Sequence, residues 1–404
     1  MSIIEMAKLL MNRDQSLSVN VLLINPPYSV APLTAYVASL AKNIIERIRF
    51  TQLPQDQTPP KLDPKAFMTS MRDGGSKFCY PMPMKFFPAA YQIHDGLNFL
   101  IDSLPKVREA KGIMVNTFLE LETHAIMSFL DTNHPLLYPV GPILNLDGVA
   151  GKTDDEDVFR WLDVQPPSSM VVVCFGSMGS FNEVQVKEMA CGLERCGHRF
   201  VWSLCLPPPQ EQSLHMHDDD PRVLLPNGFL KRTMGIGKVI GWAPHVALLA
   251  HEAVGVFVSY CGWNSMLESL WFGVPTATWP LYAEQQLNAF QMVVDLRLAV
   301  DLKMDNKMDM FNPHTNKVIV TAEEVDVGIR RLMEDNEIRA KVKEMSKLSR
   351  ATVAKGGSSY TSVDYLVKEI KGLEAEQFDH GSDALLKDEF SLCGLPALQV
   401  SAYI

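Results

Sequence analysis

Apolar and polar positions alternate along the chain with two different periods, and the pattern predicts strands and helices in turn. Short, β-branched apolar runs predict buried strands at residues 17–25, 48–53, 112–116, 169–174, 199–204, 237–241, 254–259 and 298–302. Apolar positions with helical spacing predict helices at residues 1–11, 31–45, 91–109, 120–130, 183–194, 286–296, 322–335, 338–354 and 360–370. This alternation is typical of an α/β protein.

Proline and glycine punctuation predicts how the chain divides. With 404 residues, 47% of them hydrophobic, the chain can form two cores. The segment Y-P-V-G-P-I-L-N-L after residue 137 is typical of a linker. We therefore expect a domain at 1–137, a linker at 138–150 and a second domain at 151–370. Residues 371–404 change in character and are expected to form a loosely ordered tail.

Charge and cysteine usage exclude several classes of partner. The formal net charge is −10, and no arginine-rich segment is present, which argues against nucleic acid as a partner. Seven cysteines, with no Cys-x-x-Cys pair, favour a reducing compartment. No apolar run reaches the length of a membrane span, and the start lacks the pattern of a secretory leader, so we expect a cytoplasmic location.

The most informative stretch runs from Trp242 to Gln285. Residues 254–259 predict a buried strand that ends at Tyr260, and a helix follows with Asn264 or Ser265 as its N-cap. A strand, a glycine turn at Gly262 and a helix N-terminus together present N–H groups and hydroxyls to one point. This arrangement holds phosphate.

Two residues extend this phosphate site into a nucleotide site. Glu268 lies one helical turn beyond Asn264, so its carboxylate can accept hydrogen bonds from a ribose. Trp242 offers a flat surface on which a base can stack. The stretch therefore predicts a site for a nucleoside diphosphate.

A second glycine–serine turn follows the predicted strand at 169–174. The run F-G-S-M-G-S, which contains Ser177, precedes a predicted helix. Two interpretations stay open for it: a second contact to the anion, or an ordinary turn between a strand and a helix.

Two acidic segments resemble metal sites only superficially. The acids at 154–157 open a helical run, and consecutive positions on a helix do not converge on one point. Asp218 and Asp220 form an Asp-x-Asp pair in a polar loop, whereas a metal-binding pair of this kind normally follows a buried strand. We therefore expect solvated acids in both segments and no metal site.

The stretch from Trp242 to Gln285 closely resembles the signature box of plant secondary-product glycosyltransferases, and the W-L-D to F-G-S run resembles the same family. The resemblance implies two Rossmann-like domains facing each other, with an incomplete N-terminal domain. It also implies the contacts of the donor: Trp242 and Ala243 with uracil, Glu268 with ribose, Asn264 and Ser265 with the phosphates, and Trp263, Glu284 and Gln285 with the sugar. Two positions depart from the family pattern, because His245 replaces a glutamine and Tyr260 replaces a phosphate-binding histidine.

This resemblance implies transfer of glucose from UDP-glucose to a hydroxyl of a small phenolic acceptor such as a flavonoid, with inversion and without a metal or other cofactor. We expect a monomer. The family's histidine base and its aspartate partner have no counterpart here, so no catalytic residue is assigned. His94 and His124 lie nearest in sequence, each in a helical run.

Three classes of function were compared. The first is the active glucosyltransferase, and the second is a catalytically silent, truncated or alternatively spliced UDP-sugar-binding relative. The third, a dinucleotide oxidoreductase, lacks support, since no Gly-x-Gly-x-x-Gly follows a strand.

Overall fold

The structure is a computed structural model of the 404-residue chain. It describes residues 2–17, 19–23, 48–52, 83, 86, 110–129, 135–146, 156–176, 179–205, 220–241, 244–306 and 318–371. These residues fall into two compact units. Unit 1 contains the described residues within 1–77, 94–145 and 351–404, and unit 2 contains those within 78–93 and 146–350.

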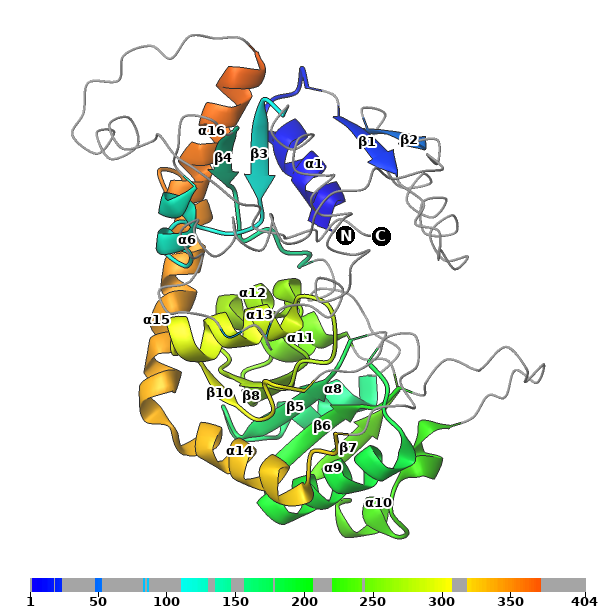
Figure 1. The fold of residues 1–404 in the computed structure, drawn as a ribbon. Helices are drawn as coiled ribbons and strands as arrows, with labels where there is room; N and C mark the ends of the chain where they lie inside the picture. Colours follow the sequence, from blue (N-terminus) through cyan, green and yellow to red (C-terminus); the bar gives the residue numbers. More distant parts are fainter. Residues whose placement is uncertain are drawn as a thin grey trace, which may run out of the picture. The chain divides into compact units, whose positions relative to one another are not determined.

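Unit 2 is built on a six-stranded parallel sheet (Figure 1). Its strands are β5 (Met170–Cys174), β6 (Arg199–Ser203), β7 (Gly237–Ile240), β8 (Val254–Ser259), β9 (Thr276–Thr278) and β10 (Ala299–Asp301). Their order is β10-β9-β8-β5-β6-β7, and every neighbouring pair is parallel. The chain first adds strands on one side of β5 and then returns to add β8 on the other side. The order therefore reverses between β5 and β8.

Helices accompany the strands of unit 2. They are α8 (Glu156–Asp163), α9 (Glu183–Cys196), α10 (Phe229–Arg232), α11 (His245–Ala250), α12 (Trp263–Phe272), α13 (Gln285–Phe290), α14 (Ala322–Glu334) and α15 (Asn336–Val353), with a 3₁₀ turn at Pro221–Leu224 and a π-helical turn at Gln291–Asp295. Helix α14 begins with a capping box, in which Thr321 and Glu324 bond each other's backbone N–H. A capping box satisfies N–H groups that have no partner inside the helix.

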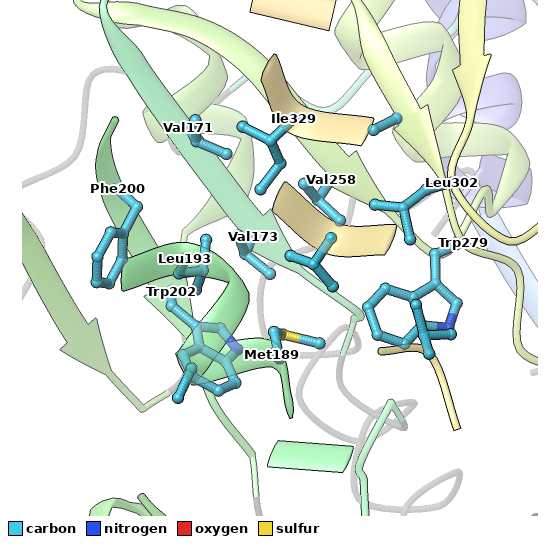
Figure 2. Packing of buried hydrophobic residues seen from close by; sticks show 14 of the residues in the cluster. Val171, Val173, Met189, Leu193, Phe200, Trp202, Val258, Trp279, Leu302 and Ile329 are labelled. Atoms are coloured by element: carbon cyan, nitrogen blue, oxygen red, sulfur yellow. The ribbon is translucent and has the colours of Figure 1, made fainter. Parts of the chain in front are cut away.

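The core of unit 2 follows the period of two along its strands. Val171 and Val173 of β5 point to one face, where they pack with Met189 and Leu193 of α9 and with Ile329 of α14 (Figure 2). The intervening residues Met170, Val172 and Cys174 point to the opposite face, where they join Val158 and Leu162 of α8 and Leu248 of α11. Strands buried on both faces explain the continuous apolar runs in the sequence.

Helices α9 and α14 approach each other closely. A methyl group added at Gly192 of α9 would lie 2.6 Å from Cβ of Val325 in α14. Such a distance is below van der Waals contact, so the packing of this pair depends on glycine at position 192.

Unit 1 contains two separate two-stranded parallel sheets within its described residues. One pairs β1 (Val19–Leu23) with β2 (Ile48–Gln52), and the other pairs β3 (Gly112–Val115) with β4 (Leu136–Pro139). The helices of this unit are α1 (Ser2–Arg13), α6 (Thr123–Ser128) and α16 (Ser358–Ile370).

Residues from both ends of the chain form the apolar cluster of unit 1. Leu10 of α1 and Tyr138 of β4 pack with Val363 and Leu366 of α16. Beside them, Arg13 pairs with Asp364 at 3.0 Å and its guanidinium lies 3.6 Å from the ring centroid of Tyr360. Helix α16 thus belongs to unit 1.

The predicted elements agree with the structure in most places. All eight predicted strands are present, with ends that differ by a few residues. Strand β9 and helix α11 were not predicted, because three and six residues give too short a pattern to detect. The predicted helices at 31–45 and 91–109, and the tail from 372, lie outside the described residues.

Two features differ from the predicted division of the chain. Tyr138 and Pro139 form the end of strand β4, so they are not part of a linker. Helix α16 groups with unit 1, whereas the sequence placed it in a domain at 151–370, because its apolar face packs on α1 and β4. Among the residues that the structure describes, no helix combines the length and apolar character needed to cross a membrane.

Candidate functional site

The strand order of unit 2 indicates where a ligand binds. In open α/β sheets, ligands bind beyond the carboxyl ends of the strands at the point where the strand order reverses. Here that point lies between β5 and β8, which end at Cys174 and Ser259. The two predicted glycine turns follow these two strands directly, so the fold brings them side by side.

The turn after β8 is fixed by hydrogen bonds around Cys261. This residue has a positive φ of 65°, which is uncommon for a residue other than glycine. Its N–H donates to Oγ of Ser259 at 3.1 Å, and its carbonyl oxygen accepts from Nδ2 of Asn288 at 2.9 Å. The sequence did not predict that Ser259 and Asn288 hold this turn in place, because a serine in a strand and an asparagine in a distant helix form no local motif.

Helix α12 begins earlier than predicted. Its N-cap is Gly262, its first residue is Trp263, and it has no side-chain N-cap. The prediction that Asn264 or Ser265 caps the helix is therefore wrong, because both residues lie inside its first turn. Gly273 ends the helix with φ of 72°, in the left-handed conformation expected of a C-terminal glycine.

The side chain of Tyr260 lies between the two glycine turns. A methyl group added at Gly176 would lie 3.0 Å from Cζ of this ring, and one added at Gly262 would lie 2.6 Å from its Cε2. The hydroxyl of Ser265 donates to the phenol oxygen at 3.2 Å. Burial raises the pKa of the Tyr260 phenol, and this effect exceeds the lowering by the Ser265 hydrogen bond, so the phenol is neutral at physiological pH.

His245 and Glu268 form a hydrogen-bonded pair. Nε2 of His245, the first residue of α11, lies 2.7 Å from Oε2 of Glu268 in α12. The Glu268 side chain is 9% exposed and that of His245 is 30% exposed. A carboxylate buried to this degree needs hydrogen-bond partners, and His245 supplies one. Within the described part of the chain, the second oxygen has no hydrogen-bond partner, so it can accept from a ligand hydroxyl.

The three residues predicted to contact the sugar lie in different surroundings. Trp263 is buried, and Glu284 is partly buried at the N-cap of α13. Gln285 accepts hydrogen bonds through Oε1 from the backbone N–H of Leu281 at 2.9 Å and of Tyr282 at 3.1 Å. The Gln285 side chain also bonds the Tyr282 phenol: burial raises the pKa of that phenol, and the hydrogen bond from Gln285 partly offsets the rise.

The remaining predicted residues divide into exposed positions and positions outside the description. Asn264 is exposed at the start of α12. Trp242, Ala243 and Ser177 lie outside the described residues, as does His94. His124 is described and exposed, on α6 of unit 1.

Asp220, Asp157 and Cys261 have structural surroundings. Asp220 caps the 3₁₀ turn by accepting from the N–H of Arg222 at 3.0 Å, and Asp157 pairs with Arg160 at 3.1 Å. In the described ranges, no three His, Cys, Asp or Glu side chains gather closely enough to hold a metal ion. Burial raises the pKa of the Cys261 thiol, which therefore stays protonated and is a poor nucleophile.

Similarity to known proteins agrees with this geometry. Over 301 residues the chain is 52% identical to UDP-glycosyltransferase 71A15 of Malus domestica, a match that covers 72% of this chain but only 61% of the relative's length. It is 40% identical to anthocyanidin 3-O-glucosyltransferase 1 of Manihot esculenta, with 91% of this chain and 98% of the relative covered.

Two solved structures share the fold. A glycosyltransferase of Siraitia grosvenorii in complex with UDP superposes with a TM-score of 0.73 at 36% identity, covering 92% of this chain and 96% of that one. A Medicago truncatula protein in complex with UDP-glucose gives a TM-score of 0.72 at 31% identity, with 92% and 95% covered. Residues 6–350 match the family model described as UDP-glucoronosyl and UDP-glucosyl transferase. The chain belongs to this family, in its plant branch.

Proposed function

We propose that this chain binds UDP-glucose at the carboxyl ends of β5 and β8 and transfers the glucose, with inversion, to a hydroxyl of a small phenolic acceptor. The observation that carries this proposal is the convergence of two glycine turns, the N-terminus of α12 and the His245–Glu268 pair at the reversal of strand order. Hydrogen-bond donors and a carboxylate at that position suit the phosphates and the ribose of one nucleotide.

Each part of the donor has a proposed partner. The uracil stacks on Trp242 beside Ala243, and the ribose hydroxyls donate to Glu268, which His245 holds in place. The N-terminus of α12, with Asn264 and Ser265, and the turn at Ser177 face the diphosphate. Glu284, Gln285 and Trp263 hold the glucose.

In the proposed reaction, the acceptor oxygen attacks the anomeric carbon while the bond from that carbon to UDP breaks. The positive end of the α12 dipole and its first-turn donors stabilise the charge that develops on the departing diphosphate. This stabilisation needs no metal ion. The acceptor loses its proton either to a group not yet assigned or before it binds.

The names of relatives guide the choice of acceptor. A Fragaria ananassa relative, 50% identical over 303 residues, is named as a putative UDP-glucose flavonoid 3-O-glucosyltransferase. Together with the Manihot esculenta protein, it supports a flavonoid or similar phenol. We further propose that the chain acts as a monomer in the cytoplasm.

UDP release from UDP-glucose tests the proposal directly. We expect release by the purified full chain in the presence of a flavonol and none without an acceptor. Glu268→Ala should abolish measurable release. Asp163→Asn is the matched control, because Asp163 also pairs with a histidine of unit 2, His251 at 3.2 Å, but is 69% exposed on α8.

A second function is favoured by the hydrogen bond from Ser265 to Tyr260, which engages a hydroxyl proposed to bind phosphate. In this alternative the chain binds uridine nucleotides but does not turn over. A folded protein that binds UDP yet shows no acceptor-dependent release would support it. If release does occur, His94→Ala and His124→Ala are the first variants in which to search for the base.

A further inference from the structure

Tyr260 occupies the point at which the two turns meet. Its phenol oxygen would lie 3.2 Å from a methyl group added at Gly176 and 2.9 Å from one added at Gly262. It also lies 3.2 Å from Oγ of Ser265. Three elements that could hold an anion, namely the two glycine turns and the first turn of α12, therefore all contact one neutral side chain.

The contacts of this ring are too close for another group to share the space. A methyl group at Gly262 would approach the ring to 2.6 Å and does not fit without movement, and one at Gly176 would approach it to 3.0 Å, which is tighter than ordinary contact. A phosphate group is larger than a methyl group. It can reach the hydroxyl of Ser265 from this side only if the Tyr260 ring moves.

The exchange of partners also opposes phosphate binding. Ser265 is 1% exposed, and among the described residues its hydroxyl donates to Tyr260 alone. A phosphate that takes this hydroxyl must first replace its bond to Tyr260, so part of the gain from the new, charge-assisted hydrogen bond is offset. Burial raises the pKa of the Tyr260 phenol, so it stays neutral and offers a phosphate no positive charge.

We propose that the Tyr260 side chain occupies the position of the donor's diphosphate, so that this residue limits the affinity of the chain for uridine diphosphates while leaving uridine binding unaffected. This inference rests on the proposed function, because it assumes that UDP binds at the β5–β8 ends. It makes Tyr260 a residue that determines donor affinity by steric exclusion.

Titration calorimetry with uridine and with UDP tests the inference on the full chain. The ratio of the two dissociation constants measures how much the diphosphate adds to the affinity of the nucleoside. In the wild-type chain we expect UDP to bind no more than about threefold tighter than uridine. Tyr260→Ala should lower the Kd of UDP at least about tenfold and leave that of uridine unchanged.

Two further variants separate the ring from its hydroxyl. Tyr260→His shortens the side chain and frees the position of the phenol oxygen, so it should also strengthen UDP binding, and it guards against poor folding of the alanine variant. Tyr260→Phe keeps the ring but removes the phenol oxygen and its bond to Ser265, so it should lower the Kd of UDP by less than Tyr260→Ala does. Tyr360→Ala removes a partly buried tyrosine of unit 1 as the matched control. Thermal melting of each variant verifies its fold.

Several outcomes would overturn the inference. Weaker UDP binding in Tyr260→Phe or Tyr260→Ala would mean that the phenol donates to the phosphate. A wild-type chain that binds UDP about a hundredfold tighter than uridine would show that Tyr260 does not block the diphosphate. Either result leaves the proposed function intact. Absence of both uridine and UDP binding in folded wild-type and Tyr260→His chains would overturn the inference and the nucleotide site together.

Discussion

Unit 2 and the described part of unit 1 differ in how their strands are supported. In unit 2, β5 and β8 are buried along their whole lengths, and helices cover both faces of the six-stranded sheet. In unit 1 the described strands form two separate pairs, and most residues of β3 and β4 are only partly buried. The difference indicates that the strands of unit 2, on which the site is built, are more deeply buried than the described strands of unit 1.

The largest expected effect tests that difference in burial. Trp202 of β6 is fully buried, so Trp202→Ala should lower the free energy of unfolding by about 3–5 kcal/mol. Leu10 of α1 is 8% exposed in a smaller cluster, and Leu10→Ala should cost about 2 kcal/mol. Urea denaturation followed by fluorescence and by circular dichroism measures both. Equal losses would show that the smaller cluster around Leu10 contributes as much as the core around Trp202.

The next effect concerns ligand affinity. Glu268→Ala removes the carboxylate proposed to accept from the ribose and leaves His245 without its partner. A hydrogen bond to a charged group contributes about 1.5–3 kcal/mol, so the affinity for both uridine and UDP should fall at least about tenfold. Calorimetric titration measures this loss. Asp163→Asn should leave both affinities unchanged, and a change of equal size in that control would exclude a specific role for Glu268.

Two carboxyl groups should give the units opposite dependence on pH. In unit 1, the hydrogen bonds from Lys371 and then Ser16 lower the pKa of Asp14. The ionised carboxylate therefore adds to the stability of the fold above the ordinary aspartate pKa of about 4, and this stabilisation is lost as the pH falls. In unit 2, burial raises the pKa of Glu284. The Glu284 carboxyl therefore loses its proton at a lower pH in the unfolded chain than in the folded chain. As a result, the free energy of unfolding falls as the pH rises from about 4.3 to the raised pKa of the folded chain.

Single substitutions can separate the effects of Asp14 and Glu284 on the pH dependence of stability. Asp14→Asn should make stability less sensitive to pH between about 2 and 4. Glu284→Gln should remove the decline above about pH 4.3 and raise the melting temperature at pH 7. Melting temperatures recorded from pH 2 to 7 measure both effects. A lower melting temperature for Glu284→Gln at pH 7 would show that the ionised carboxylate is stabilising.

The smallest expected effect lies on the surface of unit 2. Lys341 pairs with Glu337 at 2.6 Å on α15, and their side chains are 40% and 77% exposed. Exposed pairs of this kind contribute about 0.3–0.5 kcal/mol, so Lys341→Ala should barely change the urea midpoint. A loss above about 1 kcal/mol would show that the surface of unit 2, and not only its core, accounts for its stability.

The elements that could be predicted from sequence are those specified by neighbouring residues. The β8 strand and its glycine turn are local, and their residues alone predict an anion site. Pairings between distant residues could not be predicted. The order of β5 beside β8 depends on the whole sheet, and the contact of Ser265 with Tyr260 depends on a side-chain orientation that no local pattern encodes.

The N-terminal part of α12 shows the same limit on a smaller scale. Asn264 and Ser265 are good N-caps by residue type, but Gly262 occupies that position because the turn at Cys261 is fixed by Ser259 and Asn288. Similarly, helix α16 has a clear amphipathic pattern, yet the pattern cannot specify which unit its apolar face contacts.

The packing of α1 on α16 has a consequence for synthesis on the ribosome. About 340 residues separate the two helices. At a synthesis rate of about 5–20 residues per second, α16 is made roughly 20–70 s after α1. During that time the apolar face of α1, with Ala7 and Leu10, lacks the part of its cover that α16 provides. The six strands of unit 2 are translated before α16. The strands of unit 2 can therefore pair before α16 covers α1.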